Sequence, residues 1–314
     1  MKYMKIRLPL FFILTAAIAV ACKDDDDPAS LPGLSGISIP AATPFVRIGT
    51  TLEFDADTKN IKTTDSSDPG TIGMYWQVNT AGRDTLTRDI SVSNPTFSYR
   101  ADTVGTYTIY CNAYASGYYN SSATTSFKAI DPETALSGLS GTPSLVLDGR
   151  SYRSFQADGK TWLGNNLYGE NARTLYGADV LDSVLGNYYT WEEALDACPS
   201  GWHLPTGAEF DALGDDAGAL MADAAFLKEP MWEYWPDVQI TNRSGFNAIP
   251  AGYMDLSKHT NPEKGFSEYA LWWTADEVDE DRASFRYIFE NDARVQKGQG
   301  SKKTLALNIR CVRD

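Results

Sequence analysis

The 314-residue sequence predicts an all-β sandwich followed by an α+β domain, both behind an N-terminal export segment. Three observations predict this order. Short runs of β-branched and aromatic residues fill the first half, and helical spacing with capping signals appears only in the second. Segments rich in Pro, Gly and Ser, which are typical of linkers, precede each half. The predicted divisions are residues 1–21, 22–36, 37–132, 133–142 and 143–314.

Composition limits the possible functions. With 43% hydrophobic and 12% aromatic residues the chain can fill packed cores, so wholesale disorder is excluded. Lys and Arg number 27 against 41 Asp and Glu, a net charge of −14, whereas a nucleic-acid binder needs a basic face. Two His and four Cys argue against a zinc site built from several such ligands. We therefore expect no nucleic-acid partner, no cofactor and no metal.

The first residues have the pattern of a secretory signal. Three basic residues precede an apolar, uncharged stretch over residues 8–20, which is too short to span a bilayer as a helix. The stretch ends on small residues and Cys22, an ending that resembles a bacterial lipobox. That resemblance implies cleavage after residue 21 and acylation of Cys22, and several acyl chains anchor a protein stably. The alternative is an ordinary signal peptide with an incidental cysteine.

An acidic segment follows Cys22. Lys23 and four aspartates at 24–27 form either a solvated spacer or a targeting signal. The sequence resembles the surface-export signal of lipoproteins in Bacteroidota-type bacteria. We therefore expect a lipid-anchored protein of the outer membrane that faces the cell exterior.

Residues 37–132 have the pattern of a β-sandwich. Strand candidates at 51–56, 75–78, 96–99 and 106–114 are short, and turn residues separate them. The segments 73–76 and 102–109 resemble an immunoglobulin-like sandwich of the PKD-like kind, a class of spacer and adhesion modules. The resemblance implies that Trp76 fills the core rather than forming a ligand platform. Cys111 has no partner in this domain, so we expect a buried thiol and leave any further role open.

Residues 143–314 combine short strands with two helices. Trp191, Ala194, Leu195 and Cys198 have helical spacing, and Thr206 with Glu209 forms a capping box for a second helix. Strand candidates lie at 144–148, 151–156, 161–163, 202–204, 248–253, 270–274, 284–290 and 305–312.

Six phrases of this half closely resemble the Fibrobacter succinogenes major paralogous domain. They lie in order at residues 158–167, 188–194, 197–206, 244–253, 271–275 and 309–314. The resemblance implies an α+β, C-type-lectin-like C-terminal domain. It also implies a disulfide between Cys198 and Cys311, which can persist in an exported protein. The alternative is two free buried thiols.

No catalytic constellation is evident. His203 lies in a strand-like segment and is expected to be a hydrogen-bonded packing residue, and His259 is expected to be exposed. Residues 201–209 also resemble formylglycine-generating enzymes, which use late active-site thiols, but the only late cysteine is Cys311. The acidic runs at 276–281 and 290–292 offer calcium-type oxygens, although the motifs of calcium-binding lectins are absent. We expect solvated loops there.

The remaining candidate site is aromatic. Residues 231–237 place Trp232, Tyr234 and Trp235 in a polar loop with Pro nearby, and such rings stack on sugar faces. The alternative is a loop that packs its own aromatic side chains onto the core. Trp273 is a further candidate, although it follows Trp272 in a strand, so at least one of the two is expected to be buried.

These observations predict a non-enzymatic, surface-exposed lipoprotein that binds an extracellular ligand, a glycan before other classes, for capture or adhesion. One alternative is a structural or adhesion module whose ligand is a host protein. Another is a lectin-like display scaffold with diversified loops. A remote alternative is an oxidase of the formylglycine-generating type.

Overall fold

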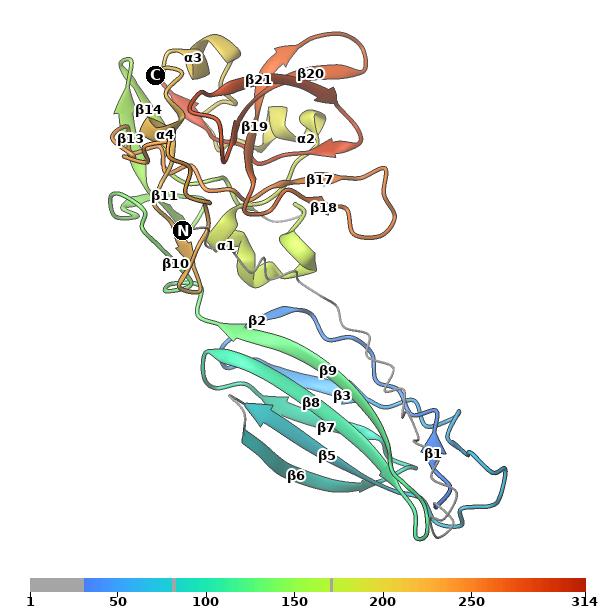
Figure 1. The fold of residues 1–314 in the computed structure, drawn as a ribbon. Coiled ribbons are helices and arrows are strands. Elements are labelled where there is room, and N and C mark those ends of the chain that lie inside the picture. The colour runs from blue at the N-terminus through green and yellow to red at the C-terminus, as the bar shows by residue number, and fades with distance from the viewer. Residues whose placement is uncertain (1–30, 81–82, 170–171) are drawn as a thin grey trace.

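The computed structural model describes residues 31–80, 83–169 and 172–314, and Figure 1 shows an all-β domain below a mixed domain. The predicted signal at 1–21, the lipidation site Cys22 and the aspartates at 24–27 lie outside the described residues. Within the described ranges, no helix is both long and apolar enough to cross a membrane.

The N-terminal domain is a β-sandwich, as predicted. A five-stranded sheet of order β2-β9-β8-β5-β6 and a two-stranded sheet of β3 and β7 enclose its core, and β1 pairs with β4 at one end. All pairs are antiparallel except β2 with β9. The strands are β1 (Leu34–Ser35), β2 (Phe45–Arg47), β3 (Thr51–Asp55), β4 (Lys62–Thr63), β5 (Gly73–Thr80), β6 (Arg83–Ser91), β7 (Thr96–Arg100), β8 (Gly105–Tyr114) and β9 (Ser121–Ile130).

Trp76 is the centre of the sandwich core, which confirms its predicted role. Its side chain is fully buried, and its ring stacks on Phe97 at a centroid distance of 5.1 Å. Cys111 lies opposite Trp76 on β8 and is also fully buried. Burial raises the pKa of the Cys111 thiol to about 12, so the thiol stays protonated at neutral pH.

Apolar contacts join the two domains. Phe45 of β2 lies 6.4 Å from the ring of Tyr176 and 5.9 Å from that of Phe226. Ile130 and Ala135 are buried in the same cluster, which is otherwise built from C-terminal residues. The connecting segment itself forms β10 (Leu136–Ser137), which pairs with β15 of the C-terminal domain. The sandwich is therefore held against the second domain by packing as well as by the chain.

The C-terminal domain combines several small sheets with short helices. The consecutive strands β19, β20 and β21 form an antiparallel three-stranded sheet. The terminal strand β23 pairs with β14. The strands are β11 (Leu145–Leu147), β12 (Arg150–Tyr152), β13 (Ser154–Ala157), β14 (Lys160–Leu163), β15 (Ala225–Phe226), β16 (Glu229–Pro230), β17 (Tyr253–Asp255), β18 (Glu263–Lys264), β19 (Tyr269–Glu277), β20 (Arg282–Phe289), β21 (Gln296–Ser301), β22 (Leu305–Ala306) and β23 (Val312–Arg313). The helices are η1 (Leu175–Gly177), η2 (Asp179–Leu181), α1 (Asp182–Leu185), α2 (Trp191–Ala197), α3 (Gly207–Asp211) and α4 (Ala217–Leu220).

Capping boxes start the two predicted helices. Thr190 caps α2 with Glu193, and Thr206 caps α3 with Glu209, so each pair satisfies backbone N–H groups at the helix start. Two predicted strands were wrong, and a third is interrupted. Of residues 202–204 only His203 makes an isolated bridge, and residues 305–312 contain β22 and the start of β23 without a continuous strand between them. Of residues 248–253 only Tyr253 enters a strand, because the segment before it crosses between sheets and makes isolated bridges.

Arg310 organises a buried polar core beneath the sheets. Its guanidinium is fully buried and donates to the side-chain oxygen of Asn166 and to the carbonyls of Leu163, Phe246 and Asn247 at 2.8–3.0 Å. The same group lies 4.3 Å from the Phe246 ring centroid. Burial lowers the pKa of Arg310 to about 9, which still leaves the side chain cationic at neutral pH. These residues belong to the phrases singled out in the sequence, so those phrases encode this network.

Candidate functional site

The aromatic residues predicted as a ligand platform do not form one. Trp232 is buried, and its indole N–H donates to the carbonyl of Ala248 at 3.3 Å. Trp273 is fully buried, and its indole N–H donates to the carbonyl of Tyr189 at 2.9 Å. Trp235 is half-buried, whereas Tyr234 is 76% exposed.

The assignment of Trp232 and Trp273 to ligand binding is therefore corrected. The loop at 231–237 packs its large rings onto the core beside Phe246 and Trp272, which was the alternative interpretation. The physical reason is burial: an indole ring enclosed by other side chains gains more from leaving water than an exposed ring would. Only Tyr234 of the predicted set presents a largely free ring.

A different group of residues forms a cavity of about 210 Å³, which we name the tyrosine pocket. Its volume is below the roughly 300 Å³ at which pockets for drug-sized ligands begin, so it suits one small group such as a single sugar ring. The pocket is lined by Leu147, Asp148, Arg150, Tyr152, Leu167, Tyr168, Gly169, Tyr189, Ala197 and Pro199.

Three segments that are far apart in the sequence build the tyrosine pocket. The hairpin of β11 and β12 forms one wall, and its tight turn uses positive φ at Asp148 (48°) and Gly149 (74°). Residues 167–169 form a second wall, which Asn187 holds by accepting the Gly169 backbone N–H at 2.7 Å. The third wall comes from α2, through Tyr189 before it and Ala197 and Pro199 around its end.

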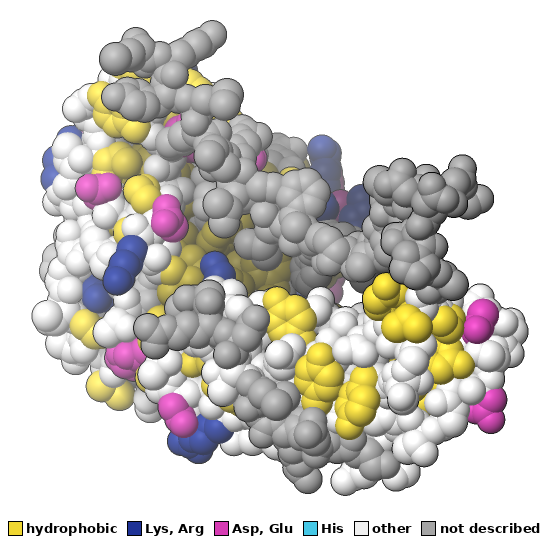
Figure 2. Space-filling model, turned by 60° about the horizontal axis from the view of Figure 1, so that its bottom comes forward, with side chains coloured by type: hydrophobic (Ala, Val, Ile, Leu, Met, Phe, Trp, Pro, Cys, Tyr) yellow, Lys and Arg dark blue, Asp and Glu magenta, His cyan; other side chains and the backbone are white. Residues whose placement is uncertain are grey.

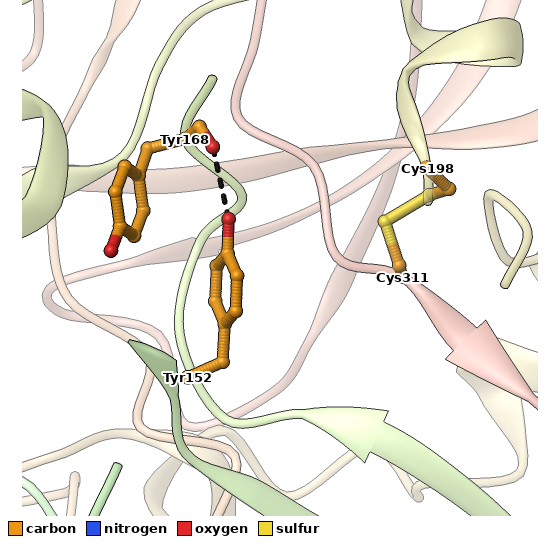
Figure 3. Close-up of a disulfide and its surroundings, with 4 residues drawn as sticks. All are labelled: Tyr152, Tyr168, Cys198 and Cys311. Atoms are coloured by element: carbon orange, nitrogen blue, oxygen red, sulfur yellow. Dashed lines mark hydrogen bonds between the residues drawn. A yellow bond between two sulfur atoms is a disulfide. The ribbon is translucent and has the colours of Figure 1, made fainter. Parts of the chain in front are cut away.

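The Cys198–Cys311 disulfide fixes the α2 wall, and Figure 3 shows it next to the pocket tyrosines. It confirms the predicted pairing, with the two Cα atoms 5.8 Å apart and 113 positions apart in sequence. Cys198 lies between the two pocket residues Ala197 and Pro199. The bond therefore ties this wall to Cys311, just before the terminal strand β23.

The three tyrosines of the pocket have different roles. The Tyr152 hydroxyl donates to the backbone carbonyl of Tyr168 at 2.9 Å, and the two rings lie 5.1 Å apart (Figure 3). Tyr189 is only 7% exposed, and a Cβ atom built on Gly169, another pocket residue, would lie 3.7 Å from its hydroxyl oxygen. Tyr189 lines the pocket, so a ligand that replaces water at its hydroxyl can form a hydrogen bond there.

Electrostatics keep these hydroxyls neutral. Burial raises the pKa values of Tyr152, Tyr168 and Tyr189, so at neutral pH each hydroxyl is protonated and can donate. At the mouth, the Arg150 guanidinium lies 5.8 Å from the Tyr168 ring centroid. With the exposed carboxylate of Asp148, it adds one donor and one acceptor group to the rim.

A titratable carboxyl lies behind the pocket wall. Asn187 holds Gly169 with its oxygen and donates from its amide nitrogen to Asp182 at 2.7 Å. Burial outweighs this hydrogen bond and raises the pKa of Asp182 to about 6. Asp182 thus titrates around pH 6, and Asn187 connects its carboxyl group to the pocket residue Gly169.

The site offers binding chemistry. In the described ranges no cluster of three or more His, Cys, Asp or Glu side chains is arranged to hold a metal ion. Cys198 and Cys311 are oxidised, and Cys111 is a buried, protonated thiol. His203 is hydrogen-bonded to Glu209 at 2.9 Å, as a packing histidine was expected to be.

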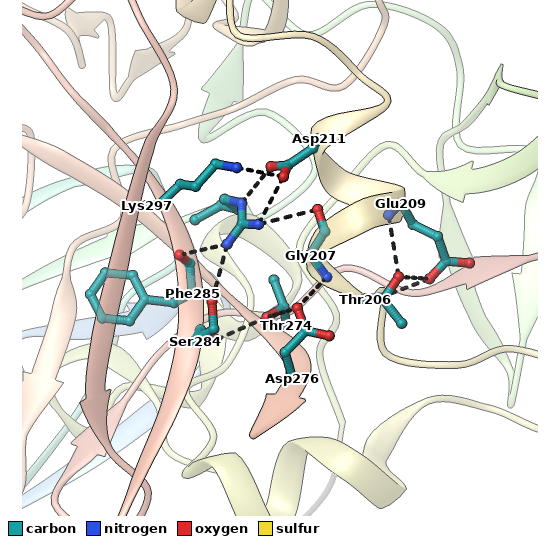
Figure 4. Close-up of polar contacts among 10 residues, drawn as sticks. Thr206, Gly207, Glu209, Asp211, Thr274, Asp276, Ser284, Phe285 and Lys297 are labelled. Carbon is teal, nitrogen blue, oxygen red and sulfur yellow. Dashed lines mark hydrogen bonds and ion pairs between the residues drawn. The ribbon is translucent and has the colours of Figure 1, made fainter. Parts of the chain in front are cut away.

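A second polar cluster braces α3 against β20 and β21 (Figure 4). The buried Arg286 donates to both carboxylate oxygens of Asp211, at 2.7 and 3.2 Å, and Lys297 pairs with the same carboxylate at 2.6 Å. Gly207 donates its backbone N–H to Asp276 at 2.7 Å. A Cβ atom at Gly207 would lie 2.4 Å from that carboxylate and 2.5 Å from the Arg286 guanidinium, so a larger residue would have to displace these side chains. The charged side chains of this cluster pair with one another and hold α3 against β20 and β21.

The acidic run at 276–281 is largely paired. Glu277 forms an ion pair with the buried Lys302, and Asp279 pairs with Arg282 at 2.6 Å. Together with the bond from Gly207 to Asp276, these contacts occupy carboxylates that a calcium site would need.

Sequence reasoning missed the tyrosine pocket. The phrase at 188–194 contains Tyr189, but spacing alone does not show which way a tyrosine faces. No sequence pattern indicated that Tyr152 and Tyr168 line a pocket, since their contact depends on a turn and a loop that fold together. The Asp148-Gly149 turn was the one local feature that could have indicated the wall.

Comparisons with known proteins give the following similarities. Residues 141–313 match the model of the Fibrobacter succinogenes major domain. No curated protein matches the chain.

Three solved structures are similar to parts of the chain. The PKD domain of human KIAA0319 is 10% identical, over 35% of this chain and 93% of that one, with a TM-score of 0.24. The PKD domain of an M14-like peptidase from a Thermoplasmatales archaeon is 18% identical, over 32% and 96%, with a TM-score of 0.20. A superoxide reductase from Ignicoccus hospitalis is 12% identical, over 30% and 80%, with a TM-score of 0.23.

Proposed function

The chain belongs to the Fibrobacter succinogenes major domain family, and from this premise we propose that it is a surface lipoprotein whose tyrosine pocket binds an extracellular glycan without altering it. The observation that carries the proposal is a cavity the size of one sugar ring that Tyr152, Tyr168 and Tyr189 line, with the Tyr189 hydroxyl beside the pocket residue Gly169.

The lining of the pocket matches the chemistry of a sugar. A sugar ring has apolar C–H faces and a rim of hydroxyl groups, so it needs both ring surfaces and directed hydrogen-bonding groups. Tyr152, Tyr168 and the two leucines supply the apolar surface. The Tyr189 hydroxyl, Arg150 and Asp148 supply donors and acceptors for hydroxyl groups.

We further propose a C-type-lectin-like fold for this domain. Two short capped helices, α2 and α3, accompany small twisted sheets, and a disulfide joins the end of the first helix to the last strand segment. These features support the proposed fold. In it, the α2 wall of the tyrosine pocket is the segment that the disulfide holds in place.

The proposal also includes the location of the protein in the cell. Acylation of Cys22 would anchor the chain, and the aspartates at 24–27 would separate the folded part from the lipid headgroups. The sandwich would then act as an arm, because apolar packing around Phe45 keeps it fixed against the C-terminal domain. A rigid arm presents the pocket away from the membrane.

A glycan array followed by titration calorimetry tests the binding proposal. Tyr189→Phe removes one hydroxyl from the pocket and keeps the ring, so we expect about two- to ten-fold weaker binding of the glycan that the array identifies. Tyr234→Phe is the matched control, because it removes a hydroxyl from an exposed tyrosine elsewhere. Equal affinity of the Tyr189→Phe and wild-type chains would refute the pocket, and failure to bind any glycan would favour a protein ligand.

A further inference from the structure

The outer face of the five-stranded sheet, in the other domain, carries a patch of tyrosine, amide and hydroxyl side chains. Side chains alternate along a strand, so the neighbours of the core residues Trp76 and Cys111 point outward. Register places Tyr75 opposite Asn112, and Gln77 opposite Tyr110. We name this group the outer-sheet patch, and it consists of Tyr75, Gln77, Tyr110, Asn112, Tyr114 and Ser122.

Tyr114 lies flat on the sheet. A Cβ atom built on Gly73, its cross-strand partner, would lie only 2.2 Å from a carbon of the Tyr114 ring, so the ring rests directly on the glycine backbone. The other face of the ring is open, since the residue is 41% exposed. The Tyr75 ring lies 5.9 Å from that of Tyr114, which extends the aromatic surface along β5.

Hydrogen bonds fix the polar groups of the patch in place. The Asn112 amide donates to the side-chain oxygen of Gln77 at 3.4 Å, and Ser122 donates to the Asn112 oxygen at 2.6 Å. Asn120 donates to the Tyr75 hydroxyl at 3.5 Å. A surface whose groups are already oriented loses little conformational entropy when a ligand binds.

The six side chains of the patch are uncharged, although the register places an acidic residue, Asp89 of β6, opposite Tyr75. Figure 2, in which the bottom of Figure 1 comes forward, shows several yellow hydrophobic side chains among white atoms on the visible face, with a few blue and magenta side chains elsewhere on it. An anionic partner would find no cationic side chain among the six residues of the patch. A neutral ligand with apolar ring faces and hydroxyl groups matches the tyrosine rings and the half-buried Gln77 amide, whereas Asn112 is buried and holds Gln77 and Ser122 in place.

We propose that the outer-sheet patch binds a neutral polysaccharide chain. Because the patch is open and not enclosed, sugar residues within a chain can lie across it, whereas the tyrosine pocket admits one small group. The proposal gives the sandwich a binding role in addition to its role as an arm. It does not depend on the tyrosine pocket, since the two sites share no residue.

Affinity electrophoresis of the full chain through gels containing a neutral β-glucan, a galactomannan or a xylan tests this inference, with polygalacturonate as the charged comparison. Tyr75→Ala/Tyr114→Ala removes both rings. Gly73→Ala keeps both rings but adds the methyl group that must lift Tyr114 off the sheet. Tyr234→Ala is the control, Tyr189→Phe reports any contribution of the tyrosine pocket, and urea unfolding confirms that each variant is folded.

We expect at least one neutral polysaccharide to retard the wild-type chain. Loss of each ring should weaken binding about two- to ten-fold, and Gly73→Ala should act in the same direction with Tyr114 still present. Retardation that is unchanged in the double variant or in Gly73→Ala would overturn the inference. So would retardation by polygalacturonate alone, or by no polysaccharide. If only Tyr189→Phe weakens binding, the tyrosine pocket is the site and the patch is not.

Discussion

Removal of the disulfide by the double substitution Cys198→Ala/Cys311→Ala should destabilise the C-terminal domain strongly. The bond joins residues 113 positions apart, and closing so long a loop restricts the unfolded chain far more than the folded one. In the chain-entropy model a loop of this length costs the unfolded state about 16 cal/mol/K, or about 4.8 kcal/mol at ~25 °C. The expected loss is therefore roughly 4–5 kcal/mol in the free energy of unfolding.

Urea unfolding followed by tryptophan fluorescence measures this loss, because every tryptophan except Trp76 lies in the C-terminal domain. The dependence of the unfolding free energy on urea should steepen as well, since the unfolded chain becomes less compact without the crosslink. The folded variant should keep its pocket, because α2 retains its Thr190 cap and the bond from Trp191 to the carbonyl of Thr274 at 2.8 Å.

Cys111→Ala is the matched control, since it removes a buried sulfur that crosslinks nothing. It should cost about 1 kcal/mol, as expected for a small core truncation, and leave the urea dependence unchanged. A loss below about 1 kcal/mol in the double variant would refute the reasoning. The disulfide would then not be constraining the unfolded chain.

Three further predictions concern buried charge. Arg310→Lys should lower the free energy of unfolding by roughly 2–4 kcal/mol, measured by urea unfolding, because an ammonium cannot reach all the acceptors that the guanidinium satisfies. Burial alone would raise the pKa of Glu209, but hydrogen bonds from Thr206 and His203 outweigh it and lower the pKa to about 2, below the ordinary 4.5. Thermal unfolding should therefore show stability lost as the pH falls from 4.5 toward 2, and Glu209→Gln should reduce that loss. The raised pKa of Asp182, about 6 against 3.8, means that the folded state binds the extra proton, so stability should fall as the pH rises through this window. Asp182→Asn should remove that fall, and a slope that persists in the variant would contradict the assignment.

Much of the sandwich could be predicted from the sequence, because its central strands alternate clearly. Residues 106–114 place large side chains on the core face, and the structure extends this strand by one residue to β8 (Gly105–Tyr114). β9 was missed, since its outward positions are Ser, Thr and Lys and its inward ones include Thr125 and Ala129. Such a strand is stabilised by its neighbours rather than by its own pattern.

The candidate site was less predictable for a different reason. Cys198 and Cys311 were paired through resemblance, and the structure contains that bond. For the aromatic residues, the sequence shows which rings exist but not which ones the core absorbs. Trp232 and Trp273 are in the core because Phe246 and Tyr189, distant in sequence, lie beside them. The tyrosine pocket arises from the same long-range packing, which no local pattern records.

A crystal structure of the chain with the glycan identified by the array tests the central claim most directly. The account predicts a sugar ring in the tyrosine pocket, with one of its oxygens within hydrogen-bonding distance of the Tyr189 hydroxyl and its apolar face against Tyr152 or Tyr168. A glycan bound elsewhere on the C-terminal domain, with the pocket empty, would contradict the account.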